Sequence, residues 1–205
     1  MSESLITKKA LGAAMKRLMA ERPFEKISVR DICTACGMNR NSFYYHFRDR
    51  QDLVFWIFDY EFIQKLRSRT YREPFALFET IAEYFYENRA YYTHAFAFTG
   101  QNCFSDYFTE VFSELCVEQI EKFFGEGPNC ALYARFVADT LRTMLIRWLN
   151  DGAAIAPTAL TQMTKKALIA LSERCVQLYP KEIELCREQR EKRERTESGA
   201  LQNRP

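Results

Sequence analysis

The chain has 205 residues, of which 47% are hydrophobic and 27% charged, with a formal net charge of +2. This composition is typical of a globular protein, and the small net charge argues against a general binder of polyanions. No apolar run reaches the roughly 18 residues of a membrane-spanning helix, and no secretory signal opens the chain, so we expect a soluble, cytoplasmic protein with no membrane partner.

The first expected helix runs from about Thr7 to Glu21. Leu11, Met15 and Leu18 repeat there at helical spacing, and Pro23 ends the helix because the residue before a proline is pushed out of helical geometry. Over residues 1–47, eight Lys and Arg residues stand against four Asp and Glu residues, a surplus of 8 − 4 = 4 positive charges. The N-terminal end is therefore the basic part of the chain.

Two short helices separated by a glycine turn are expected over residues 28–47. Ser28 is a good N-cap for the first of them, and Gly37 follows where a helix end requires a left-handed residue. Asn39 caps a second helix, which runs from Arg40 to Phe47. This pattern is typical of a helix-turn-helix, whose second helix enters the major groove of DNA.

The second helix has two faces. Phe43 and Phe47 are four residues apart, so both point into a core. Arginine suits guanine edges, asparagine suits adenine edges, serine suits either, and tyrosine hydroxyls suit phosphates. We therefore predict base contacts from Arg40, Asn41 and Ser42, and phosphate contacts from Ser28, Tyr44, Tyr45 and His46, with Tyr45 able to make either kind.

The run Phe43-Tyr-Tyr-His-Phe-Arg-Asp-Arg50, following Ile32 and Gly37, resembles the end of the DNA-binding domain of TetR-family transcriptional regulators. The resemblance covers residues 5–65, with the helix-turn-helix at 28–47. It implies that Arg50, where the family usually has lysine, grips a phosphate. A three-helix module of the same outline that touches no nucleic acid is the competing interpretation.

The remaining chain shows helical periodicity and no strand pattern. A helix from about Asp49 to Leu66 is followed by a polar boundary at residues 67–74 and by a second, aromatic-rich domain at 75–180. We thus expect an all-α protein of about nine helices: an N-terminal three-helix head and a C-terminal helical bundle. Residues 181–205 form a charged tail, either a solvated extension of the last helix or a frayed end.

The second domain is rich in aromatic residues and lacks the polar clusters of an active site. Most of these rings belong to a core, but apolar cavities with a few polar groups also bind small ligands between helices. By the resemblance, this domain holds an effector pocket and the dimer face. The candidate pocket residues are Phe85, Tyr92, Phe96, Phe108, Phe112, Phe136 and Arg142.

The resemblance also implies a homodimer formed by the eighth and ninth expected helices, from about Cys130 to Asn150 and from Pro157 to Pro180. Two heads about one helical turn of DNA apart, roughly 34 Å, would read a palindromic operator. We expect a repressor rather than an activator. At finer grain, the head is similar to regulators associated with dihydroxyacetone kinase, so the effector is either a small molecule or a protein.

Three other classes of function compete with DNA binding. Cys33-Thr-Ala-Cys36 is a CxxC motif, typical of a redox pair or of half a zinc site, but no second CxxC follows and the chain has only two histidines. We therefore assign both cysteines to core packing, and keep a thiol redox sensor and a helical partner-binding adaptor as alternatives. No nucleophile–base pair or phosphate-binding loop stands out, so we expect no enzyme, no cofactor and no metal.

Overall fold

The computed structural model describes residues 3–69, 71, 74–124, 127, 129–188 and 191–192, and within these ranges every regular element is a helix. The expected all-α fold, with a helix-turn-helix head and a helical C-terminal domain, is confirmed. None of the helices in the described ranges has the length and apolarity to cross a membrane.

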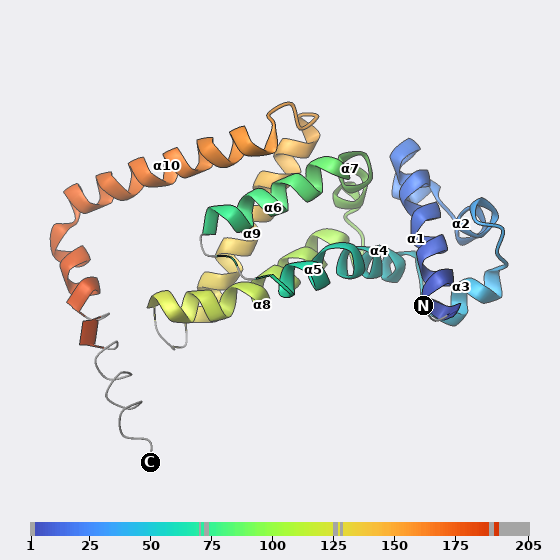
Figure 1. Ribbon diagram of the computed structural model, residues 1–205, viewed down its shortest axis with the longest axis horizontal. Coiled ribbons are helices and arrows are strands. Elements are labelled where there is room, and N and C mark those ends of the chain that lie inside the picture. The colour runs from blue at the N-terminus through green and yellow to red at the C-terminus, as the bar shows by residue number, and fades with distance from the viewer. Residues whose placement is uncertain are drawn as a thin grey trace, which may run out of the picture.

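The head lies at one end of the molecule (Figure 1). It contains α1 (Glu3–Glu21), the single 3₁₀ turn η1 (Phe24–Lys26), α2 (Val29–Ala35) and α3 (Arg40–His46). The first helix begins at Glu3, four residues before the expected Thr7, so residues 3–6 are helical as well. Leu11, Met15, Ile32 and Phe43 are fully buried together and form the core of the head.

A helical rod joins the head to the rest of the molecule. It consists of α4 (Arg50–Phe58), the π-helical turn η2 (Asp59–Ile63) and α5 (Gln64–Arg67), and we call these three elements the connector. The one helix expected from Asp49 to Leu66 is therefore continuous but carries a π turn in its middle. This turn is why the described residues up to Leu178 divide into ten α-helices where about nine were expected.

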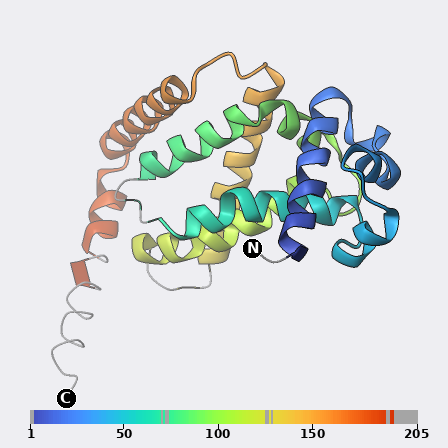
Figure 2. The same ribbon diagram turned by 45° about the vertical axis from the view of Figure 1, so that its right-hand side comes forward.

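The body consists of α6 (Pro74–Glu87), α7 (Arg89–Ala97), α8 (Phe104–Phe124), α9 (Cys130–Asn150) and α10 (Pro157–Leu178). Helices α8 and α9 pack along each other, and α10 packs on α6 at its start and then extends away from the body (Figures 1 and 2). Of the expected charged tail, residues 181–188 are helical and mostly exposed, after a break at Tyr179, and most of the remainder lies outside the described residues.

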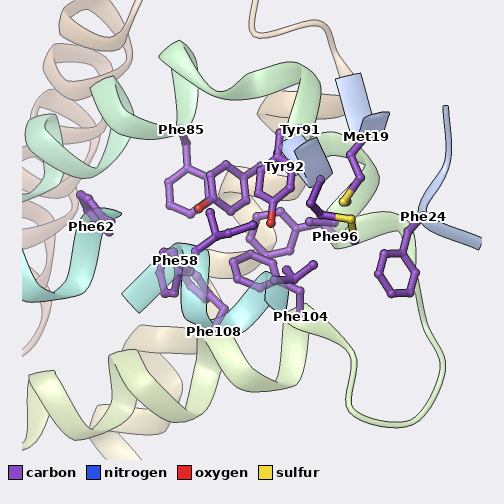
Figure 3. Close-up of a cluster of buried hydrophobic side chains, with 14 of the residues drawn as sticks. Met19, Phe24, Phe58, Phe62, Phe85, Tyr91, Tyr92, Phe96, Phe104 and Phe108 are labelled. Atoms are coloured by element: carbon purple, nitrogen blue, oxygen red, sulfur yellow. The ribbon is translucent and has the colours of Figure 1, made fainter. Parts of the chain in front are cut away.

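Phe58 of the connector is fully buried at the centre of an aromatic cluster (Figure 3). Its ring contacts seven others at centroid distances of 5.2–6.5 Å, contributed by the connector, α6, α7 and α8. Edge-to-face and offset aromatic pairs add to the free energy of burial. The cluster therefore fixes the connector to the body.

Phe58→Ala should lower the free energy of unfolding by about 3–5 kcal/mol, because it removes a buried ring and leaves a cavity that rigid neighbours fill only in part. Urea denaturation followed by circular dichroism measures the change. Tyr45→Ala is the matched control, since Tyr45 is 82% exposed and its truncation should cost within about 0.5 kcal/mol. Equal losses in the two variants would contradict the central place of Phe58.

Polar contacts tie α1 of the head directly to other elements. The Lys16 ammonium pairs with the Glu61 carboxylate of the π turn at 2.5 Å, and His94 Nδ1 of α7 lies 2.5 Å from the carbonyl oxygen of Met19. The rings of Phe24 and Phe98 add a contact at 4.9 Å. The head is thus held by the connector on one side and by α7 on the other.

Candidate nucleic-acid interface

The start of α2 is fixed by a capping box between Ser28 and Asp31. The backbone N–H of Asp31 donates to Ser28 Oγ at 3.1 Å, and the backbone N–H of Ser28 donates to Asp31 Oδ2 at 2.8 Å. The Ser28 hydroxyl also donates to Asp31 Oδ2 at 2.7 Å. These two bonds from Ser28 hold the pKa of Asp31 below its usual 3.8, so its carboxylate is charged at neutral pH. Ser28 remains exposed despite this role.

Gly37 makes the turn between α2 and α3. Its φ of +69° lies in the left-handed region, where a side chain is strained. A Cβ there would meet no atom within 4 Å, so the requirement for glycine comes from the backbone conformation and not from crowding. The backbone N–H of Met38 then donates to the Cys33 carbonyl at 2.9 Å and closes the end of α2.

Helix α3 is anchored by one face and exposed on the other. Asn39 caps it by accepting a hydrogen bond from the Ser42 N–H at 2.8 Å, and Phe43 and Phe47 are buried in the head core. On the other face Tyr45 is 82% exposed and Tyr44 is 51% exposed. Arg40 and Asn41 are also exposed. The predicted base-contacting side chains therefore reach solvent from a helix whose backbone is fixed.

Two of the predicted contact residues are partly engaged inside the head. The Ser42 hydroxyl donates to Asn39 Oδ1 at 3.1 Å and so supports the N-cap. His46 is half-buried, and burial together with the Lys8 ammonium lowers its pKa below 6.5. The shift favours the neutral ring, which would contact a phosphate as a hydrogen-bond donor and not as a charge.

A hollow of about 480 Å³ lies beside α3 at the junction of η1, α2, α3 and α4. We call it the basic hollow, because four cationic side chains line it and Glu25 is its one acidic residue. Two of its lining residues are in contact, since the Arg40 guanidinium lies 6.0 Å from the centroid of the Tyr44 ring. The lining residues are Glu25, Lys26, Ile27, Ser28, Val29, Arg30, Arg40, Tyr44 and Arg50.

Arg50 has a more structural position than the resemblance implied. Its Nη1 donates to the carbonyl oxygen of Phe24 at 3.0 Å and to that of Ile27, and its guanidinium lies over the Phe24 ring at 4.6 Å. The side chain is half-buried and holds the turn before α2 against the start of α4. It lines the basic hollow, so its charge still acts there, and its phosphate contact stays a prediction.

Lys26 and Arg30 were not singled out from the sequence. Both are exposed and line the basic hollow on either side of Ser28. In the sequence they contribute only to the surplus of positive charge at this end. Their positions on either side of the N-cap residue Ser28 are the sequence signal that identifies them as candidate contacts.

Seven residues were predicted to line an effector pocket in the body. Five of them pack ring against ring in the buried aromatic cluster, namely Phe85, Tyr92, Phe96, Phe108 and Phe112. Phe136 does not join them, because it lies on α9 with 70% of its surface exposed. Arg142 pairs with Asp139 at 3.1 Å and with Asp106 at 4.0 Å at the edge of the α8–α9 contact. The pocket itself stays a prediction.

The two cysteines of the CxxC motif lie in the head core as free thiols. Cys36 Sγ donates to the Ile32 carbonyl at 3.3 Å, and Cys33 Sγ lies 3.5 Å from the Asn39 carbonyl. Burial raises the pKa of both thiols, which keeps them protonated and poorly reactive. In the described ranges no group of histidine, cysteine and acidic residues is arranged to hold a metal ion. These observations favour the core-packing interpretation.

Asn39→Ala should weaken DNA binding without removing any predicted contact residue. The substitution deletes the N-cap of α3, which costs about 1 kcal/mol of helix stability, and frees the Ser42 side chain. Asn39→Ser is the matched control because serine also caps. Thermal unfolding and DNA affinity should fall in the alanine variant and recover in the serine variant; a serine variant as weak as alanine would mean that Asn39 itself contacts DNA.

Family models match both the head and the body of the chain. A family model described as "Bacterial regulatory proteins, tetR family" matches residues 11–56, and one described as "Transcriptional regulator C-terminal region" matches residues 72–170. The chain belongs to the TetR family. It is therefore a DNA-binding transcriptional regulator and not an enzyme, as expected from the sequence.

One curated relative of this TetR-family chain is the HTH-type dhaKLM operon transcriptional activator DhaS of Lactococcus lactis. The two are 33% identical over 70 residues, which is 34% of this chain and 37% of that protein. The matched part thus spans little more than a third of the relative. It agrees with the expected similarity to regulators associated with dihydroxyacetone kinase.

Solved structures of other regulators share the fold. A dihydroxyacetone kinase operon activator DhaS superimposes with a TM-score of 0.61 at 22% identity, over 82% of this chain and 96% of that chain. NalD, the secondary repressor of the MexAB-OprM multidrug efflux pump in Pseudomonas aeruginosa, gives 0.59 at 15% identity over 82% and 96%. The fatty acid degradation regulator FadR of Bacillus halodurans gives 0.56 at 17% over 79% and 94%. At these identities the likeness establishes the fold alone.

Proposed function

We propose that the chain acts as a homodimeric repressor that binds a palindromic operator through α3 and responds to an effector bound by the body. The observation that carries the proposal is the exposed polar face of α3, with Arg40, Asn41, Tyr44 and Tyr45, beside the basic hollow. Cations that neutralise phosphates supply affinity and register, and side chains at the base edges supply specificity. Both kinds of group meet on one surface of the head.

The dimer face is assigned to α9 and α10, which are the eighth and ninth helices of the sequence analysis. Beyond Lys165 every residue of α10 is exposed, although many of them are apolar. Large exposed apolar surfaces mark interaction sites, and a two-fold axis would pair this surface with the same surface of a second copy. The exposed apolar residues are Leu132, Tyr133, Phe136 and Val137 of α9, and Met163, Leu168, Ile169, Leu171, Val176 and Leu178 of α10.

Control by an effector requires a physical link between body and head. The connector supplies it through buried Phe58, and α1 adds the Lys16–Glu61 ion pair and the contact of His94 with the Met19 carbonyl. An effector that prefers one arrangement of the body would therefore favour one spacing of the two heads. An effector without such a preference would change nothing.

Fluorescence anisotropy with DNA from upstream of the chain's own gene tests operator binding. We expect tight binding that falls steeply as salt rises, because each phosphate contact releases counterions. A scrambled DNA of the same length is the control. Weak binding that is indifferent to sequence, here and in DNA selected from random sequences, would support the alternative of a helical partner-binding adaptor.

An activator is the second candidate, because the curated relative with 33% identity is named a transcriptional activator. A reporter gene behind the operator separates the two directions of control. Deleting the regulator should raise reporter output if the chain represses. A fall in output after deletion would establish activation and overturn the repressor part of the proposal.

A further inference from the structure

A second hollow, of about 390 Å³, lies between the connector and α8. Its size falls within the range of small-ligand sites. It is distinct from the basic hollow of the head, which lies at the other end of the connector. The lining residues are Asp59, Ile63, Gln64, Arg67, Tyr107, Glu110, Val111 and Glu114, and we call this space the connector cavity.

The charges and the apolar surface of the connector cavity specify a ligand type. Three carboxylates and one guanidinium line it, which leaves two net negative charges. Asp59 is half-buried, whereas Glu110 and Glu114 are exposed on α8. The side chains of Ile63 and Val111 are buried and supply apolar surface. The cavity therefore offers an inner acidic group, an outer acidic pair and apolar surface.

The Asp59 carboxylate is held in place by one hydrogen bond, which leaves its second oxygen without a protein donor in the described residues. The Tyr107 hydroxyl donates to Asp59 Oδ2 at 2.6 Å, and the Tyr107 ring is stacked on Phe55 at a centroid distance of 4.1 Å. No side chain or backbone group in the described ranges donates to Asp59 Oδ1. Burial raises the pKa of Asp59, against the hydrogen bond from Tyr107 and the charge of Arg67. A half-buried carboxylate in this state gains from a cation that replaces lost water.

We propose that the connector cavity binds a small aliphatic diamine, with one ammonium group at Asp59, its methylene chain against Ile63 and Val111, and the second ammonium group at Glu110 and Glu114. A single amine would leave the outer acidic pair unmatched, and a dicarboxylate would meet net negative charge. The diamine matches the net charge of the cavity and presents both cationic and apolar groups to its lining.

The position of the cavity gives the ligand a route to the head. Asp59 and Ile63 belong to the π turn of the connector, and Glu61 of the same turn pairs with Lys16 of α1. Single π turns inside α-helices are irregular segments that often lie at functional sites. A ligand that bridges the turn to α8 would thus act two residues along the chain from Glu61, which contacts the head. This consequence, unlike the binding itself, rests on the proposed DNA-binding function.

Isothermal titration of the full chain with putrescine tests the assignment, with butanediol as a neutral ligand of the same length. We expect saturable binding of one putrescine per chain and none of butanediol. Asp59→Asn should weaken putrescine binding about tenfold, the effect of losing one charge-assisted hydrogen bond. Asparagine can still accept the Tyr107 hydroxyl bond, so a circular dichroism melt should show a folded variant.

Glu173→Gln is the matched control, because it removes an exposed carboxylate of α10 far along the chain from the cavity residues. It should bind putrescine like the parent. The proposal is overturned if putrescine does not bind or does not saturate, if butanediol binds equally, or if Asp59→Asn binds putrescine like the parent. It is also overturned if magnesium ions bind with the same stoichiometry and displace putrescine. The titration contains no DNA, so its failure and the failure of operator binding are separate results.

Discussion

Arg40→Ala should weaken operator binding by a factor of about thirty or more. A good bidentate contact from arginine to a base contributes about 1–3 kcal/mol, and a dimer loses two of them, which gives about 2 kcal/mol at the lower end. Arg40 is exposed and its guanidinium contacts the Tyr44 ring at 6.0 Å, so the fold should not depend on it. Fluorescence anisotropy on operator and scrambled DNA measures the change, and discrimination between the two should fall with the affinity.

Arg89→Ala is the matched control for Arg40→Ala. Arg89 is also exposed and also lies over a neighbouring tyrosine, Tyr86, at 4.7 Å, but it belongs to α7 of the body. It should bind operator like the parent. Arg30→Ala distinguishes a phosphate contact from a base contact. Loss of a phosphate contact should weaken binding to all DNA sequences, and should reduce the slope of log affinity against log salt concentration by about one per contact. Parent-like binding by Arg40→Ala would contradict base reading by α3.

Phe136→Glu should convert the dimer into monomers and abolish tight operator binding. Phe136 is 70% exposed in the isolated chain, and in the proposed dimer it is buried against the second copy. Truncating a central aromatic residue of an interface lowers the free energy of association by about 2 kcal/mol or more. In a symmetric dimer this loss occurs twice, and burying an unpaired carboxylate in the interface weakens association further. Analytical ultracentrifugation measures the mass, and anisotropy measures the DNA affinity.

Leu171→Glu tests the α10 half of the same surface and should give the same result. Lys166→Glu is the control, because Lys166 is exposed on α10 and the substitution exchanges one charged side chain for another. Thermal melts should show that all three variants keep their helices. A parent chain that is monomeric would contradict the proposed dimer. A Phe136→Glu chain that stays dimeric would place the interface elsewhere.

The head could be predicted in detail because its signals are local. Ser28 and Asn39 cap the helices that they precede, Gly37 adopts the left-handed conformation of the turn, and Phe43 and Phe47 are buried. Each of these features depends on residues within a few positions along the chain. Backbone capping and helical spacing are sufficient to specify them without knowledge of the tertiary structure.

The body was less predictable because helical periodicity does not say what an apolar face contacts. Phe108 and Phe136 both lie on apolar helix faces, yet Phe108 is fully buried in the aromatic cluster and Phe136 is exposed on α9. The bonds of Arg50 to the carbonyls of Phe24 and Ile27, and the ion pair of Lys16 with Glu61, join residues 23 to 45 positions apart. Such pairings follow from the packing of helices and leave no pattern in a single sequence. The π turn at Asp59 likewise has no local sequence signal.

Selection of bound DNA from a random-sequence pool is the most direct test of the central claim that two copies of α3 read DNA as a pair. The account predicts an enriched palindrome whose half-sites are centred about one helical turn, roughly 34 Å, apart or a multiple of it. The same selection with Arg40→Ala should lose enrichment at one base pair in each half-site. An unenriched pool, or a single half-site without its inverted partner, would contradict the account.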